Sequence, residues 1–362
     1  MEDRSSVAAP PIDEGASMGE SEPAETGSGG SEDSRRSEGS GGSRSMTARA
    51  KALLGSKTMR VAFVVAAVAL GAFAVADQWS QVTSAFADLG AGTVAAAFAF
   101  VVLSLLCSGM VWRSLLSAAG SRVPLASAGR IFFVGQIGKY LPGAVWPVLA
   151  QMELGQAQRI PRRRSATVAI VTMLVSLVAG LLAAAAFLAA GSGGAGYAWA
   201  FLAVPVLAVG LHPRVLNPVI DRLLRLARRP PQEQPLTLRA IVTAVLWAVG
   251  YWILSGLQIW LLAVRLGAPD GRALALSIGG FAFAWCVGFL VVLAPAGAGV
   301  REAVLVAALH PVLGPGKALA IALMSRLLTT IADVLTAGIA AWYGRGRSHG
   351  AVPAQASGPE RD

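Results

Sequence analysis

Six ionisable side chains interrupt the long apolar runs of this sequence, and they are the first candidates for chemistry. A charged side chain inside a bilayer is costly, so such residues usually mark a site or a path for a polar group. The six residues are Lys139, Glu153, Arg301, Glu302, Arg326 and Asp333. We therefore expect a functional site to be built from these side chains.

Arg301 and Glu302 come directly after a stretch rich in glycine and proline. The predicted helix breaks there are Pro295, Gly297 and Gly299. A helix that starts after such a break presents free N–H groups and the positive end of its dipole, and both favour an anion. Arg301 adds a bidentate donor that suits phosphate or carboxylate. The pattern therefore predicts an anion site at the start of the new helix.

A purely structural role for the same charges is the main alternative. Arg301 would then pair with Asp333, or Lys139 with Glu302, and the pairs would only lock helices together. Arg326 and Asp333 share a helix face but lie about 10 Å apart along its axis. We therefore expect each of the two to find its partner on another helix. A proton relay through Asp333 is a further alternative.

Lys139 lies in the middle of an unusual apolar segment, residues 129–155, with arginines on both sides. Short loops rich in arginine stay on the cytoplasmic side, so both ends of the segment are expected on one side of the membrane. A single crossing cannot achieve this. We predict a helix that enters the membrane, breaks near Gly138, Pro142 and Gly143, and turns back. Irregular backbone at that depth must be buried in protein or line a wet cavity.

The composition is that of a polytopic membrane protein. Of the 362 residues, 55% are hydrophobic and 14% are charged, whereas soluble domains carry roughly a quarter charged residues. The net charge is +10, and the basic residues beyond the acidic residues 1–45 cluster in a few loops, where they report topology and contact with anionic lipid heads. We expect no nucleic-acid partner. Cys107 and Cys286 lie in apolar runs, and no spacing predicts a metal site or another cofactor.

Three regions follow from the composition along the chain. Residues 1–45 are rich in Ser, Gly and Glu and predict a disordered acidic tail in the cytoplasm. Residues 46–345 form the membrane domain, with broken elements at 129–155 and 294–313. Residues 346–362 form a short disordered tail.

The apolar runs predict an all-α integral membrane protein of about seven to eight transmembrane helices plus the broken or re-entrant element. The full spans are expected at 61–76, 92–112, 166–190, 197–211, 240–264, 273–293 and 318–343. Residues 300–313 are too short for a full span, which needs about 20 residues. They either act as the eighth crossing, which puts both termini in the cytoplasm and is the favoured topology, or they are re-entrant.

A basic amphipathic stretch, residues 217–229, lies in the longest predicted cytoplasmic loop. Apolar residues alternate there with arginines at helical spacing. The pattern suits a short helix on the inner leaflet. A solvated basic helix that only fixes the orientation of the chain fits it equally well.

Two motifs together resemble a known family. The sequences FFVGQIGKYLPGAVWPVLAQMELG and LAPAGAGVREAVLVAAL look like the transmembrane flippase region of the bacterial lysylphosphatidylglycerol synthase family, over about residues 60–345. The matching positions are Gly135, Gly138, Lys139, Pro142 and Gly143, then Pro295, Gly297, Gly299, Arg301 and Glu302. Ala296 and Ala298 stand where a more glycine-rich variant is expected.

The resemblance implies a flippase-like transporter of the bacterial plasma membrane and not an enzyme. Full-length members carry a soluble aminoacyltransferase domain after the spans, whereas this chain ends about twenty residues after the last one. The implied cargo is an anionic phospholipid or a polyprenyl-phosphate-linked saccharide. Two alternatives are a non-catalytic scaffold for a cell-envelope enzyme and an integral-membrane lipid-phosphate transferase.

Specific roles follow for the charged residues under the transport interpretation. Lys139 and Arg301 would hold the lipid phosphate, while Glu302 would orient Arg301 or release the cargo. Arg326 and Asp333 would form a supporting charge pair or a coupling site. Because no nucleotide motif is present, movement is expected to be passive or ion-coupled.

Overall fold

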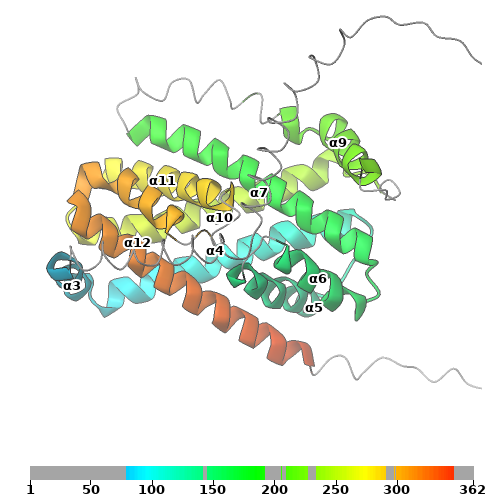
Figure 1. Ribbon diagram of the computed structural model, residues 1–362, viewed down its shortest axis with the longest axis horizontal. Coiled ribbons are helices and arrows are strands. Elements are labelled where there is room, and N and C mark those ends of the chain that lie inside the picture. The colour runs from blue at the N-terminus through cyan, green and yellow to red at the C-terminus, as the bar shows by residue number, and fades with distance from the viewer. Residues whose placement is uncertain are drawn as a thin grey trace, which may run out of the picture. The chain divides into compact units, whose positions relative to one another are not determined.

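The computed structural model describes residues 79–141, 145–191, 205, 209–226, 234–290, 297 and 299–345. Within these ranges the chain is helical and contains no strand, which confirms the predicted all-α class. The elements are α3 (Trp79–Leu89), α4 (Ala91–Ala118), α5 (Leu125–Gly129), the π-helical turn η1 (Arg130–Val134), the 3₁₀ turn η2 (Ile137–Tyr140), α6 (Trp146–Gln156), α7 (Arg162–Gly191), α9 (Pro213–Leu226), α10 (Leu238–Arg265), α11 (Asp270–Leu290) and α12 (Val300–Arg345), as Figure 1 shows.

Five of the described helices are long and apolar enough to cross a membrane. They are α4, α7, α10, α11 and α12. The predicted span at 61–76 lies outside the described residues, and so does most of the predicted span at 197–211. The count of seven to eight spans therefore stays a prediction, while the multi-pass architecture is clear from the five helices.

Small residues let these helices approach closely. A Cβ atom added at Gly256 of α10 would lie 2.5 Å from the Cα atom of Ile278 on α11. A Cβ atom at Gly279 of α11 would lie 2.7 Å from the backbone nitrogen of Leu188 on α7. Helices in a membrane associate through such close packing. Lipid tails are as apolar as the side chains, so contact between helices gains no hydrophobic free energy. These glycines therefore fix α11 between α7 and α10.

Gly256→Ala is expected to lower the free energy of unfolding by about 2–3 kcal/mol, because the new methyl group collides with backbone that cannot yield. Gly338→Ala on α12 is the matched control, since nothing lies within 4 Å of its added Cβ. Alanine there should be neutral or stabilising by up to about 1 kcal/mol. Denaturant titrations of the two variants in detergent would compare them. Equal stability of the two variants would contradict the packing role of Gly256.

The bundle has two ends that can be defined by hydrogen bonds among helix ends and the loops beside them. At one, which we call the Gly191 end, Arg272 donates from Nε to the carbonyl oxygen of Gly191 over 3.1 Å. Lys317 donates from Nζ to the carbonyl oxygen of Leu266 over 2.8 Å. The loops predicted to face outward thus meet at a common end.

The opposite end gathers the basic loops, and we call it the Arg164 end. Arg164 donates from Nη1 to the hydroxyl of Ser121 over 2.7 Å. The side chain of Asn217 accepts from the backbone N–H of Leu236 at 3.0 Å and donates to its carbonyl oxygen at 2.9 Å. The structure therefore sorts the loops as the charge pattern predicts. That the Arg164 end faces the cytoplasm stays a prediction.

Helix α12 is a hairpin of two limbs that turn at Gly314, whose φ of 74° and ψ of 172° are not helical. Glu302 and Arg326 lie at equal sequence distances on either side of this glycine and form an ion pair, so the limbs run antiparallel. Figure 1 shows the first limb in orange and the second limb running from orange to red. The second limb extends past α5, near the Arg164 end, to Arg345. The short segment 300–313 therefore returns the chain to the Gly191 end.

Candidate functional site

The segment around Lys139 is a helical hairpin. One limb consists of α5, η1 and η2, and the other is α6. The hydrogen bond between Ser121 and Arg164 joins the residues before and after the hairpin, so the chain enters and leaves at the same end. Of the predicted breaks, Gly138 lies in the 3₁₀ turn η2, whereas Pro142 and Gly143 lie outside the described residues.

Glycine allows the two limbs to touch backbone to backbone. A Cβ atom at Gly138 would lie 2.8 Å from the backbone nitrogen of Pro147 and 2.8 Å from the carbonyl carbon of Trp146. A Cβ atom at Gly135 would lie 2.7 Å from the side chain of Gln151. The first limb also passes from π-helical to 3₁₀ geometry, a pattern that often accompanies functional sites. These features hold the tip of the hairpin, with Lys139 and Tyr140, in a fixed place.

Gly138→Ala is expected to open the hairpin and to reduce stability by about 2–3 kcal/mol, because both colliding groups are backbone atoms. Gly129→Ala is the control in the same limb, since its Cβ would make ordinary contacts of 3.7 Å with the ring of Phe133. A double-cysteine distance measurement across the limbs, together with a melting curve, would report both effects. A hairpin that stays closed in Gly138→Ala would refute the steric explanation.

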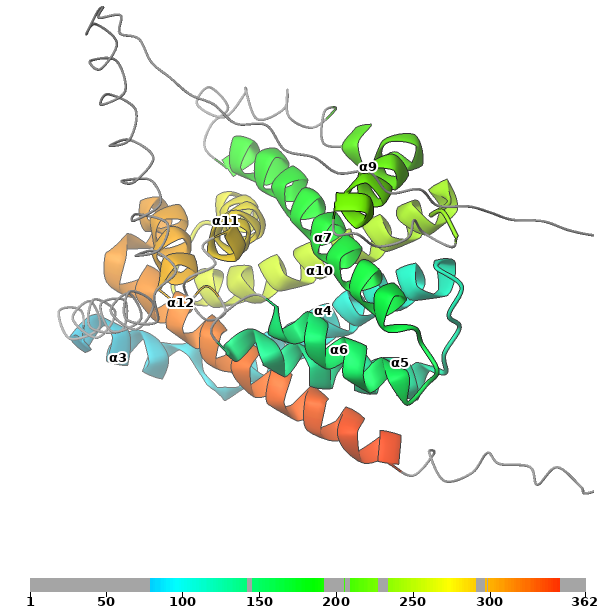
Figure 2. The ribbon, with the colours of Figure 1, turned by 45° about the vertical axis from the view of Figure 1, so that its right-hand side comes forward.

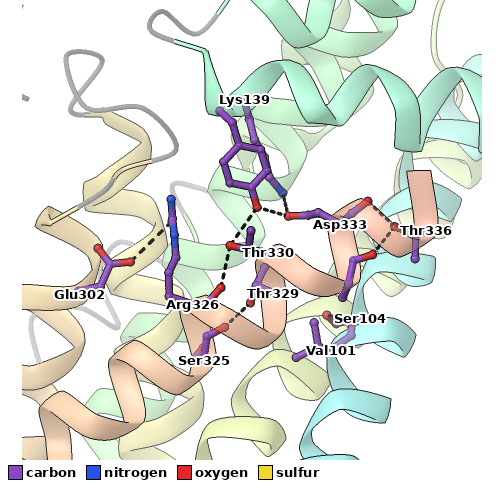
Figure 3. A network of polar contacts seen from close by, with 12 residues as sticks. Val101, Ser104, Lys139, Glu302, Ser325, Arg326, Thr329, Thr330, Asp333 and Thr336 are labelled. Atoms are coloured by element: carbon purple, nitrogen blue, oxygen red, sulfur yellow. Dashed lines mark hydrogen bonds and ion pairs between the residues drawn. The ribbon is translucent and has the colours of Figure 1, made fainter. Parts of the chain in front are cut away.

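Lys139 and Tyr140 both bind Asp333, which lies on the second limb of α12. Figure 3 shows Lys139 pointing toward Asp333. The Nζ atom of Lys139 lies 2.6 Å from Oδ2 of Asp333, and the hydroxyl of Tyr140 donates to the same oxygen over 2.6 Å. The side chain of Asp333 is 4% exposed and that of Lys139 is 30% exposed. The side chain of Asp333 is therefore buried, whereas the side chain of Lys139 is partly exposed.

Glu302 and Arg326 form the second pair of the site. The Oε1 atom of Glu302 lies 3.6 Å from Nη1 of Arg326, and Oε2 accepts from the backbone N–H of Gly299 over 2.7 Å. The Glu302 side chain thus reaches back to the start of its own helix, as the acid of a capping box does. A carboxylate already occupies the helix start where the sequence predicted free N–H groups.

Tyr140 joins the two pairs. Its ring centroid lies 5.5 Å from the ammonium nitrogen of Lys139 and 5.8 Å from the guanidinium carbon of Arg326. Its hydroxyl also lies 3.4 Å from the hydroxyl of Thr330, one turn along α12 from Arg326. We call Lys139, Tyr140, Glu302, Arg326 and Asp333 the charged cluster.

Arg301 lies apart from both ion pairs. Its side chain is buried, with 8% exposure, and its guanidinium carbon lies 4.7 Å from the ring centroid of Phe281 on α11. Within the described residues, no carboxylate lies within ion-pair distance of Arg301. A guanidinium stacked on an aromatic face keeps its donors available at the edge of its plane.

The glycines at the break hold Arg301 close to α11. Gly297 and Gly299 both have positive φ, 69° and 84°, which suits glycine. A Cβ atom at Gly288 of α11 would lie 3.2 Å from the Cβ atom of Arg301 and 3.5 Å from the Cα atom of Gly297. Pro295 lies outside the described residues.

The family model for the lysylphosphatidylglycerol synthase TM region matches residues 59–337. The chain belongs to this family. The predicted resemblance is thereby confirmed, and the match includes the hairpin, the charged cluster and Arg301. A comparison with curated proteins gave no match. Membership and the five apolar helices together establish a multi-pass membrane protein of the lysylphosphatidylglycerol synthase TM region family.

The pairing in this family member differs from the pairings weighed in the sequence. Lys139 binds Asp333 and not Glu302, while Arg301 binds neither acid. Glu302 does not orient Arg301 through an ion pair, because it binds Arg326 and Gly299 instead. Glu153 forms an exposed ion pair with Arg162 over 2.7 Å and is not in the cluster.

Sequence reasoning missed Tyr140, the uncharged member of the charged cluster, and one polar contact in the core of the bundle. Tyr140 follows Lys139 directly, and a phenol inside a membrane protein needs a partner for its hydroxyl, so its position at the hairpin tip was a usable signal. Gln258 donates to the hydroxyl of Ser325 over 2.7 Å in the buried core between α10 and α12. An amide in the middle of an apolar helix signals such an interhelical bond.

Proposed function

We propose that this protein moves an anionic lipid between the two leaflets, either a phospholipid or a polyprenyl-phosphate-linked saccharide. The observation that carries the proposal is the buried guanidinium of Arg301, which has no carboxylate partner among the described residues. Together with the charged cluster, Arg301 brings the cations to three and leaves the carboxylates at two. The cations are Arg301, Lys139 and Arg326, and the carboxylates are Glu302 and Asp333. An excess of positive charge between the helices of a membrane protein calls for an anion, and a phosphate is the anion that membrane lipids supply.

Arg301 and Lys139 are the proposed phosphate ligands. Arg301 offers a planar pair of donors that its stacking on Phe281 holds in place. Lys139 is partly exposed and can exchange its bond to Asp333 for a bond to the phosphate. Tyr140 would then keep Asp333 hydrogen-bonded while Lys139 is engaged. The acyl or prenyl chains would stay in the bilayer, because only the head group needs a polar path.

Glu302, Arg326 and Asp333 serve the site as positioning residues in this proposal. Glu302 caps its helix and holds Arg326 beside Tyr140, so these residues keep the hairpin tip against α12. Exchange of Lys139 between Asp333 and the phosphate would let the cargo loosen the tip. Asp333 is also the group through which an ion could couple to movement, because its bond to Lys139 competes with the cargo. The protein would act as a transporter in the bacterial plasma membrane, with both termini in the cytoplasm.

Lipid movement in proteoliposomes tests the proposal. Fluorescent phosphatidylglycerol and a short polyprenyl-phosphate sugar would be compared with a neutral glycolipid that lacks phosphate. We expect the protein to accelerate the movement of at least one phosphate-bearing lipid and to leave the neutral one at the rate of empty vesicles. Folded protein that moves none of the three would sink the transport proposal and favour the scaffold. Equal movement of all three would show that the cations do not select the cargo.

A further inference from the structure

Helix α9 has two apolar faces, of which the bundle covers one. Leu216 and Ile220 are each 5% exposed, so this face is packed against the protein. Val215, Val219 and Leu226 are exposed, and their spacing of four and seven residues places them along one stripe. Single exposed apolar side chains are common on water-facing helices, but three in one stripe form a continuous apolar patch, which is typical of an interaction surface.

Arginines flank the exposed stripe. Arg214, Arg222 and Arg225 are all exposed, whereas Asp221 is the one acid in the sequence of α9. The chain continues with Arg228 and Arg229. The outer side of α9 therefore combines apolar contact area with net positive charge, which is the composition of helices that lie in the head-group region of an anionic membrane.

The level of α9 is fixed by its link to α10. The side chain of Asn217 forms hydrogen bonds with the backbone N–H and carbonyl oxygen of Leu236. Leu236 directly precedes Thr237, whose side chain caps the first turn of α10. Figures 1 and 2 place α9 beside this end of the bundle. The apolar stripe thus lies where an apolar spanning helix begins, which is the level of the lipid head groups.

We infer that α9 binds the anionic surface of the leaflet at the Arg164 end, through a site separate from the charged cluster. Val215, Val219 and Leu226 enter the boundary between head groups and acyl chains. Arg214, Arg222 and Arg225 extend their stems over the same boundary and bind lipid phosphates. The inference shares no residue with the proposed transport site, so it stands or falls independently of lipid movement.

A single fluorescent label on α9 tests the inference in the full-length protein. Cys107 and Cys286 would be replaced by alanine, and Val219→Cys would carry an environment-sensitive dye. The labelled protein would be placed in vesicles with or without phosphatidylglycerol, and quenching by a spin-labelled lipid would be compared with quenching by aqueous iodide. Leu246→Cys is the reference, because this residue is exposed on the spanning helix α10.

We expect the dye at position 219 to be quenched by lipid and protected from iodide in anionic vesicles. High salt should expose the dye to iodide again, and so should Gln at Arg214, Arg222 and Arg225. Each arginine removed should lower the equilibrium constant for membrane binding of α9 by about fivefold. The dye at position 246 should be quenched by lipid in every case. Iodide access at 219 that does not depend on phosphatidylglycerol would overturn the inference, and so would lipid quenching that ignores both vesicle charge and the arginines. Protection from both quenchers would overturn it as well, since protein would then cover the stripe.

Discussion

Lys139→Ala is expected to destabilise the protein by about 3 kcal/mol, because it leaves a buried carboxylate without its cation. Asp333 is 4% exposed, and the variant would leave Tyr140 as its remaining donor among the contacts that the structure describes. Asp333→Asn should cost less, about 1–2 kcal/mol, because the Lys139 side chain is 30% exposed and is not confined beside the new amide. The unequal burial of the two partners thus predicts an order of stability.

The double variant Lys139→Ala/Asp333→Asn separates the ion pair from the rest of the site. We expect it to be more stable than Lys139→Ala alone, since it contains neither an unpaired acid nor an unpaired base. Denaturant titrations of the four proteins in detergent would give the coupling free energy, which should be about 1–3 kcal/mol. Additive effects would show that Lys139 and Asp333 do not interact across the hairpin tip. Lipid movement adds a second readout, because Asp333→Asn keeps Lys139 available for phosphate and Lys139→Ala does not.

Arg301→Gln is expected to slow the movement of a phosphate-bearing lipid by roughly ten- to a hundredfold. The slowing corresponds to the free energy of one buried charge-assisted hydrogen bond between Arg301 and the cargo. Arg301→Lys should retain part of the rate, because the charge stays while the bidentate geometry is lost. The same proteoliposome assay would measure both. Arg162→Gln is the matched control, since its ion pair with Glu153 is exposed and lies outside the cluster.

The stability of Arg301→Gln distinguishes a ligand-binding role from a structural one. Arg301 has no carboxylate partner in the described chain, so its removal leaves no acid unpaired there. We expect the melting temperature to stay the same or to rise, because the variant removes a buried charge that has no carboxylate partner among the described residues. A strong loss of stability would show that Arg301 holds helices together. Unchanged lipid movement in well-folded Arg301→Gln would place the phosphate site elsewhere.

The sequence alone predicted the class of the fold and the hairpin that carries Lys139. Apolar composition allows few structures other than membrane-spanning helices, because every backbone group in lipid must be bonded within the protein. Arginines on both sides of residues 129–155 predicted that the segment returns to its starting side. The glycines and charged residues at the two breaks were also sufficient to indicate the family, which the match over residues 59–337 confirms. These signals are local in the chain and need no knowledge of packing.

The pairing of the charges was decided only by the tertiary structure. Lys139 and Asp333 lie far apart in the sequence. Nothing in the spacing of the residues favours this pair over the pairs Lys139–Glu302 or Arg301–Asp333. The turn of α12 at Gly314 brings Arg326 back to Glu302, and the close contact of Gly138 with α6 sets the height at which Lys139 meets α12. An ion pair forms between side chains that packing brings within reach. The helix-to-helix contacts of this bundle therefore determine which acid neutralises which base, and they leave Arg301 without a carboxylate partner among the described residues.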